Sequence, residues 1–123
     1  ANAYRGFPGM AHTGAARAGV ENLTKTLSQE WASRGVRINA VAPGLIESSG
    51  LETYPQAIQD YFQRAKDRNL MKRYGTIEDV AQAVIFFASP LSSYVTGSTL
   101  YVDAGDHLAA DRMALYNLLD SMS

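Results

Sequence analysis

The stretch GAARAGVENLTKTLSQEWASRGVRINAVAPGLIES, residues 14–48, holds a helix, its stop and a strand in direct succession. Its first part repeats apolar residues at the spacing of one helix face: Val20, Leu23, Leu27 and Trp31. This spacing predicts a helix from Thr13 to about Ser33, with Thr13 as its cap and Gly35 as its stop. Five small residues surround the single charge of Arg17 in the first turns, which suggests that a large or flat group lies against them.

The strand predicted after this helix is VRINAVAP, residues 36–43, which the Pro43-Gly44 turn ends. It is mostly apolar on both sides of the pleat, a pattern typical of a strand inside a parallel sheet. A second strand is predicted near 98–102. Further helices are expected over three segments: 55–69, Thr76 to Pro90 with Thr76 and Asp79 as a capping pair, and the tail 107–123.

Two buried strands joined by a helical crossover imply a parallel α/β layer. Two strands cannot cover the faces of at least three helices, so we expect further polypeptide to complete the sheet. The chain begins with Ala1 in a loop rich in glycine and proline, and we therefore expect a processed or truncated chain.

The composition sets the class of protein. The chain has 123 residues, 46% of them hydrophobic and 19% charged, which suits one modest globular domain. A net charge of -1 and a pI near 6.1 give no electrostatic reason to expect nucleic acid or an anionic membrane as a partner. The sequence contains no cysteine, which excludes disulfides and thiol nucleophiles, and we predict no metal site. We expect no signal peptide in these residues, and the sequence has no apolar run of about 20 residues that would span a membrane.

Three motifs occur in order and at fixed intervals: AGV..LTK.L..EW, then G.R.N.V.PG, then S.Y.TG..L.VD.G. Over residues 7–105 they resemble the C-terminal half of the short-chain dehydrogenase/reductase (SDR) superfamily. Residues 7–25 are similar to the peroxisomal trans-2-enoyl-CoA reductases and, less closely, to the 2,4-dienoyl-CoA reductases. The resemblance implies an α/β fold, the C-terminal portion of a Rossmann-like doubly wound parallel sheet, over residues 1–105. Residues 106–123 would form a tail.

The resemblance assigns Arg17 to the position of the lysine in the superfamily's Tyr-x-x-x-Lys pair, and Thr13 to the position of the tyrosine. Arginine can bind a ribose but cannot release a proton at working pH, and a threonine hydroxyl is too weak an acid to replace tyrosine. The pair is therefore unsuited to ordinary ketone chemistry. It could donate hydrogen bonds to the thioester oxygen when a conjugated C=C bond is reduced. The alternative is that Thr13 is only a cap and Arg17 only a surface charge.

The resemblance also implies cofactor contacts in the segment after the first strand: Pro43, Gly44, Ile46 and Ser48. There the Pro43-Gly44 turn places the backbone near Ile46 against the nicotinamide carboxamide, and Ser48 binds the pyrophosphate. The alternative for Pro43-Gly44 is a plain turn. No Gly-x-x-x-Gly-x-Gly motif occurs, so we expect another part of the fold to hold the phosphates of NADP, or of NAD.

Other candidates are weaker. His12 and Tyr4 lie close to Thr13 in sequence, and both are more often incidental than catalytic. Lys25 lies two turns beyond Arg17 and cannot share a ligand with Thr13. Residues 49–72 match the substrate-covering segment of the superfamily. Its basic residues could meet coenzyme A phosphates or form a solvated helix face: Arg64, Lys66, Arg68, Lys72 and Arg73.

The leading hypothesis is the C-terminal part of an NADP-dependent reductase that acts on an acyl-CoA-like enoyl substrate. Its expected partners are that small-molecule substrate, an N-terminal half without which the 123 residues are inactive, and further copies in a dimer or tetramer. A non-catalytic remnant or assembly module is one alternative, and an SDR that acts on a ketone or alcohol is another. We expect a cytoplasmic location, or a peroxisomal one in a eukaryote.

Overall fold

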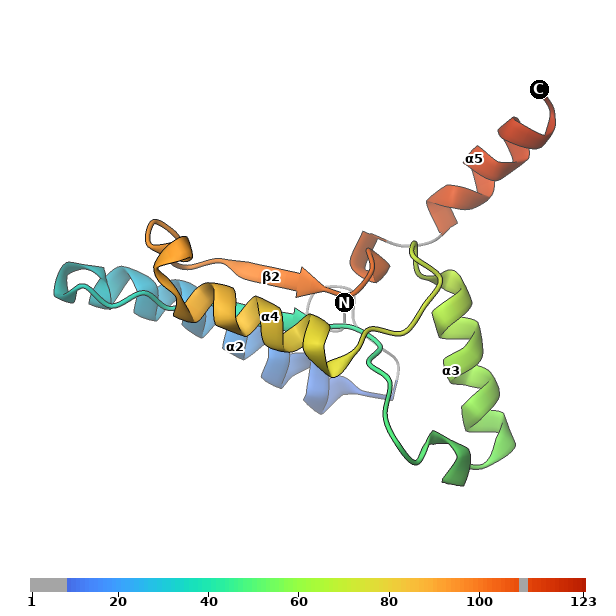
Figure 1. The fold of residues 1–123 in the computed structure, drawn as a ribbon, viewed down its shortest axis with the longest axis horizontal. Helices are drawn as coiled ribbons and strands as arrows, with labels where there is room; N and C mark the ends of the chain where they lie inside the picture. The colour runs from blue at the N-terminus through green and yellow to red at the C-terminus, as the bar shows by residue number, and fades with distance from the viewer. Residues whose placement is uncertain (1–8, 109–110) are drawn as a thin grey trace.

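The computed structural model describes residues 9–108 and 111–123. Its helices and strands follow the predicted order: α2 (Ala11–Trp31), β1 (Ala40–Pro43), α3 (Gln56–Arg68), α4 (Ile77–Ala88), β2 (Thr99–Val102) and α5 (Asp111–Ser121). Short 3-10 turns connect several of these elements (Figure 1). Among the helices of this described part, none combines the length and the apolar character needed to cross a bilayer.

β1 and β2 pair in parallel, with Ala40 opposite Thr99 and Pro43 opposite Val102. The crossover between them contains α3 and α4, and α4 contacts both strands while α2 contacts β1. Figure 1 shows both strands pointing toward the end of the sheet where α2 begins. The α/β class with a parallel sheet is therefore confirmed, and the start of α2 shares one edge of the sheet with the carboxyl ends of the strands.

β1 is shorter than predicted, because it begins at Ala40 and not at residue 36. In the residues before Ala40, side-chain hydrogen bonds take the place of much of the backbone pairing expected of a strand. The guanidinium of Arg37 donates to the Ser92 hydroxyl at 2.8 Å and to the Phe87 carbonyl at 3.0 Å. The amide of Asn39 donates to the Val95 carbonyl at 2.9 Å. Polar side chains thus anchor the amino end of the sheet to the end of α4.

α2 begins earlier than predicted. The Gly14 N–H donates to the Met10 carbonyl at 2.9 Å, which starts the helix at Ala11 and makes Met10 the residue at the cap position. Thr13 therefore lies within the first turn, and its prediction as the cap is wrong. At the other end Gly35, with φ +76°, takes the left-handed conformation that stops a helix, as predicted.

The capping pair predicted for the helix after Thr76 is confirmed. The Thr76 hydroxyl accepts from the Asp79 N–H at 3.0 Å, and the Asp79 carboxylate accepts from the Thr76 N–H at 2.9 Å. Arg73 also binds the Asp79 carboxylate, at 3.1 Å. The hydrogen bond from the Thr76 backbone, followed by that from Arg73, holds the pKa of Asp79 below its ordinary value.

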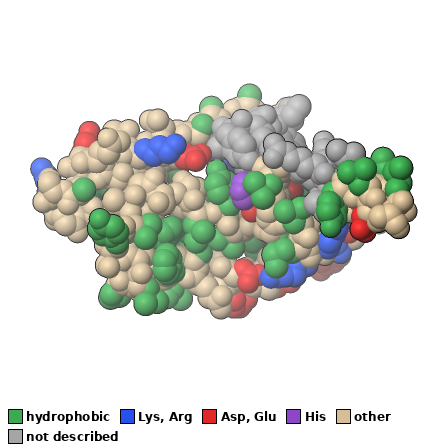
Figure 2. All heavy atoms as spheres, turned by 90° about the horizontal axis from the view of Figure 1, so that it is seen from above, with side chains coloured by type: hydrophobic (Ala, Val, Ile, Leu, Met, Phe, Trp, Pro, Cys, Tyr) green, Lys and Arg blue, Asp and Glu red, His purple; other side chains and the backbone are tan. Residues whose placement is uncertain are grey.

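The two strands leave most apolar side chains uncovered. Among the described residues, Ala65 and Ala83 are the only buried apolar side chains. On α2, Val20 is 58% exposed, and on α4, Ile85 is 63% exposed, so both helices present apolar faces that the sheet does not cover. Figure 2 shows hydrophobic side chains exposed at several places across the face in view. The expectation that two strands cannot cover these helices agrees with this burial pattern.

Replacing Arg37 with Lys tests the anchor at the amino end of the sheet. Lysine can reach one acceptor but lacks the planar fork that reaches Ser92 and Phe87 together. We expect R37K to lower the free energy of unfolding by about 1–3 kcal/mol in urea denaturation. The control R34K changes an exposed arginine and is expected to shift it by less than about 0.5 kcal/mol. If R37K and R34K lowered the free energy of unfolding equally, the role of Arg37 as an anchor of the sheet would be contradicted.

Replacing Asp79 with Asn tests the cap of α4. Because the folded-state pKa of Asp79 is depressed, its carboxylate stabilises the fold above the ordinary pKa of 3.8 and loses that contribution as pH falls through the lower folded-state value. We expect thermal denaturation to show D79N less stable than the parent at about pH 6, with the difference shrinking as the pH falls below 3.8. E78Q, at an exposed position in the same turn, is the control and should give a smaller difference. A difference for D79N that is unchanged at low pH would refute the assignment.

Candidate cofactor and substrate site

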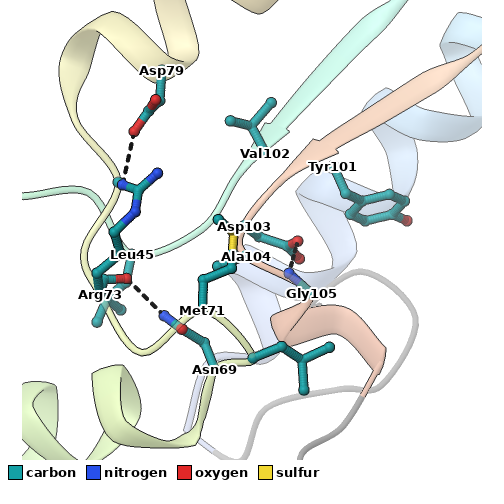
Figure 3. Close-up of a pocket in the computed structure, with 12 residues that line it drawn as sticks. Leu45, Asn69, Met71, Arg73, Asp79, Tyr101, Val102, Asp103, Ala104 and Gly105 are labelled. Atoms are coloured by element: carbon teal, nitrogen blue, oxygen red, sulfur yellow. Dashed lines mark hydrogen bonds and ion pairs between the residues drawn. The ribbon is translucent and has the colours of Figure 1, made fainter.

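The candidate site lies where the parallel strands end, the edge at which open α/β sheets bind their ligands. A cavity of about 480 Å³ opens there. Figure 3 shows its walls: Leu45 after β1, the connector 69–75 before α4, and the residues from Tyr101 to Gly105 at the end of β2. Each wall of the cavity therefore comes from a different segment of the sequence.

The Pro43-Gly44 turn is packed tightly against the end of β2. The Gly44 N–H donates to the Val102 carbonyl at 3.0 Å. A Cβ atom added at Gly44 would lie 2.7 Å from the Cα of Asp103, which is closer than packed atoms allow. Pro43, the last residue of β1, is exposed. Only glycine permits this approach, so the turn holds the loop after β1 in one position.

Ile46 follows the cavity-lining residue Leu45 and keeps backbone hydrogen-bonding groups that its bridge to Gly75 does not use. Ile46 bridges Gly75 in parallel, and the bonds of the bridge run from Glu47 N–H to the Gly75 carbonyl and from Gly75 N–H to the Leu45 carbonyl, each 2.9 Å. In this pattern the flanking residues make the bonds. Among the described residues, neither the N–H nor the carbonyl of Ile46 itself has a hydrogen-bond partner. This geometry suits a planar amide such as a carboxamide, while Ser48 is exposed beside it.

Thr13 and Arg17 lie four residues apart on α2 and therefore share one face of its first turns. Thr13 is partly buried and Arg17 exposed. Within the described ranges neither side chain makes a hydrogen bond or an ion pair. They belong to the first two turns of α2, which begins at the end of the sheet toward which both strands point (Figure 1).

The weaker candidates occupy other surroundings. His12 and Lys25 are exposed on α2, and Tyr4 lies outside the described residues. Three of the five basic residues between 64 and 73 have local partners. Lys66 lies over the Tyr74 ring at 5.5 Å, the Lys72 ammonium donates to the Asp67 carbonyl, and Arg73 binds Asp79. These contacts favour a solvated helix face over a phosphate site.

Sequence reasoning missed a cluster at the end of β2. The carboxylate of Asp103 lies 2.9 Å from Nδ1 of His107, and the imidazole stacks on the Tyr101 ring with centroids 4.2 Å apart. The available signal was the four-residue spacing of Asp103 and His107 directly after the predicted strand. Only the turn between them, however, brings the two side chains together.

Comparison with known proteins gives the family. A family model described as "Enoyl-(Acyl carrier protein) reductase" matches residues 1–107. The chain is 43% identical over 100 residues to the 3-oxoacyl-(acyl-carrier-protein) reductase FabG of Thermotoga maritima, covering 81% of this chain and 39% of that protein. It is 39% identical over 103 residues to the peroxisomal 2,4-dienoyl-CoA reductase of Saccharomyces cerevisiae, covering 83% of this chain and 35% of that protein.

Solved structures agree. A putative betaketoacyl-ACP reductase matches with a TM-score of 0.74 and 40% identity, over 88% of this chain and 44% of the other. The NADPH-bound structure of a short-chain oxidoreductase from Pseudomonas aeruginosa, described as containing an atypical catalytic center, matches with a TM-score of 0.70 and 39% identity, over 84% and 41%. The chain thus spans less than half the length of these relatives. On the family match and these identities, the chain belongs to the short-chain dehydrogenase/reductase family.

Proposed function

We propose that the chain is the C-terminal part of an NADP-dependent oxidoreductase that reduces the conjugated C=C bond of an enoyl thioester such as a trans-2-enoyl-CoA or dienoyl-CoA. The observation that carries the proposal is the pair Thr13 and Arg17 on one face of α2, at the edge where the strands end. A dienoyl-CoA reductase is among its relatives. A 39%-identical structure described as having an atypical catalytic center supports an altered catalytic pair.

The chain's own residues have distinct roles in this proposal. Bound NADPH would supply the hydride that reduces the substrate. Arg17 donates to the ribose hydroxyls, and with the Thr13 hydroxyl it donates to the thioester oxygen, where negative charge develops as the β-carbon is reduced. Donors held in place before the reaction stabilise that charge without needing a phenol to release a proton to the oxygen. The enolate then takes a proton from water at its α-carbon, which completes the reduction.

The residues after β1 fit the nicotinamide end of the cofactor. The N–H and carbonyl of Ile46 match the acceptor and donor of a carboxamide, and the Pro43-Gly44 turn holds them in place against β2. The Ser48 hydroxyl donates to the pyrophosphate. NADP is the proposed cofactor and NAD the alternative, since structures of relatives are described with NADP or NADPH bound.

We further propose that residues 1–105 belong to one SDR domain with residues 106–123 as its tail, and that the domain is completed by an N-terminal half. The chain covers 39% of its FabG relative, and the exposed apolar faces of α2 and α4 offer surfaces for that half and for further copies in a dimer or tetramer. The 123 residues alone are then inactive, because their sequence contains no Gly-x-x-x-Gly-x-Gly motif for the phosphates.

A second candidate is reduction of a 3-oxoacyl thioester, which the 43% identity to FabG favours. Hydride addition to a ketone turns its oxygen into an alkoxide. This alkoxide must take up a proton, and the donor needs a pKa closer to neutrality than that of a threonine hydroxyl. Thr13 therefore favours the enoyl reaction.

Turnover by the full-length protein tests the proposal. We expect NADPH consumption with trans-2-decenoyl-CoA and little with the matching 3-oxoacyl-CoA. R17M removes the charged donor and is expected to lower kcat/KM by about 100-fold, whereas R17K should retain part of the activity. The matched control K25M changes an exposed cation two turns away and should leave kcat/KM unchanged. Turnover of the 3-oxoacyl-CoA alone would replace the proposal by the second candidate, and no turnover of either would favour a non-catalytic module.

A further inference from the structure

A nearly buried carboxylate organises the turn that follows β2. The side chain of Asp103 is 6% exposed and accepts the N–H of Gly105 and the N–H of His107, each at 3.1 Å. It also accepts from Nδ1 of His107, which lies 2.9 and 3.1 Å from its two oxygens. A hydrogen bond to an ionised acceptor is stronger than a neutral one, so the imidazole is firmly held.

The imidazole of His107 in turn supports an aromatic wall. Its plane lies 18° from that of the Tyr101 ring, with a 4.2 Å separation of the centroids. Tyr101 and Asp103 both line the cavity at the end of the sheet (Figure 3). His107 itself does not line the cavity, and it contacts two residues that do.

The same turn contacts the opposite wall of the cavity. The Leu70 N–H donates to the Ala104 carbonyl at 3.0 Å, and a Cβ atom added at Gly105 would lie 2.5 Å from Cδ1 of Leu70. Ala104 has φ +53°, a left-handed conformation that favours glycine, so other contacts must hold the turn in this shape. The bonds that Asp103 accepts from residues 105 and 107 supply that constraint.

The lining of the cavity indicates the kind of ligand that fits it. Its polar side chains already have partners within the chain. Asn69 binds the backbone at residues 72 and 73, Arg73 and Asp79 bind each other, and Asp103 binds His107. The remaining side chains are apolar or aromatic: Leu45, Leu70, Met71, Tyr101, Val102 and Ala104. A cavity whose polar groups are satisfied internally is suited to an apolar chain.

We propose that His107 is a positioning residue: through Asp103 and Tyr101 it holds the turn 103–105 as one wall of a cavity that binds the apolar tail of a long-chain acyl group. The inference rests on the proposed function, since the acyl thioester is the substrate assigned there. The inference concerns the acyl tail, which lies remote from the reacting carbons. It assigns the preference for one acyl chain length over another to the turn after β2.

The first test measures binding without turnover. Dodecanoyl-CoA and butanoyl-CoA, two saturated thioesters, are titrated into the full-length protein by calorimetry. We expect H107A to weaken dodecanoyl-CoA about tenfold and to leave butanoyl-CoA unchanged, because only the long tail reaches the cavity. H107N retains a donor toward Asp103 and should restore part of the affinity. The matched control D106N alters a neighbouring exposed charge and should bind both thioesters like the parent.

A second measurement separates a loss of wall geometry from a loss of fold. Amide hydrogen exchange in H107A is expected to accelerate at Gly105 and Leu108 while the amides of α4 stay protected. With a long-chain enoyl-CoA, KM should rise about tenfold and kcat should change less than about twofold. Equal weakening of both thioesters, or unchanged binding of both, would overturn the proposal.

The two proposals fail separately. If the protein binds dodecanoyl-CoA more tightly than butanoyl-CoA and H107A removes that difference, the role of His107 is upheld even when no enoyl-CoA is turned over. If enoyl-CoA is turned over but H107A affects short and long chains alike, the enoyl assignment holds and the role of His107 is refuted.

Discussion

The rest of the structure depends on how closely the loop after β1 approaches the turn after β2. Gly44 lies so near Asp103 that any side chain at position 44 would overlap the backbone there. Parallel pairing from Ala40 to Pro43 leads into this contact. Because the two loops meet in only one arrangement, the backbone of Ile46 and the cavity wall at Tyr101 are placed relative to each other. Steric exclusion at one glycine therefore sets the geometry of the candidate site.

The opposite end of the sheet is held by polar groups. Arg37 binds Ser92 and the end of α4, and Ser92 is fully buried (0% exposed). Each strand has only four residues, so the ladder alone contributes few bonds to the pairing. The side chains of Arg37 and Asn39 extend the connection beyond it. A polar anchor at one end and a steric contact at the other thus define a small sheet that leaves its helices largely uncovered.

Two pairs of residues lie near the carboxyl edge of the sheet, and each pair is held together in a different way. Thr13 and Arg17 share a face because four residues make about one helical turn, a relation that local structure guarantees. Asp103 and His107 are also four residues apart, but they belong to a turn whose shape depends on contacts with Leu70. In our proposals the first pair donates hydrogen bonds to the substrate, and the second pair, with its carboxylate nearly buried, holds a wall of the cavity.

The sequence by itself determined the order of the elements, the α/β class with parallel strands, the helix near residues 56–68 and the cap at Thr76. Each of these follows from signals that act over a few residues: apolar periodicity, capping side chains and helix-stopping glycines. The capping signal alone did not locate the start of α2. Thr13 was expected at the cap, but the bond from Gly14 to Met10 starts the helix earlier.

Only the tertiary structure decided the length of β1 and the wall of the cavity. Arg37 and Asn39 find acceptors 50 and 56 residues away, and these bonds replace part of the predicted strand. The stacking of His107 on Tyr101 and the contact of Gly105 with Leu70 likewise require segments that no pattern within one element relates. Local sequence sets which elements form, and steric fit and hydrogen bonding between remote segments set where those elements end and what they enclose.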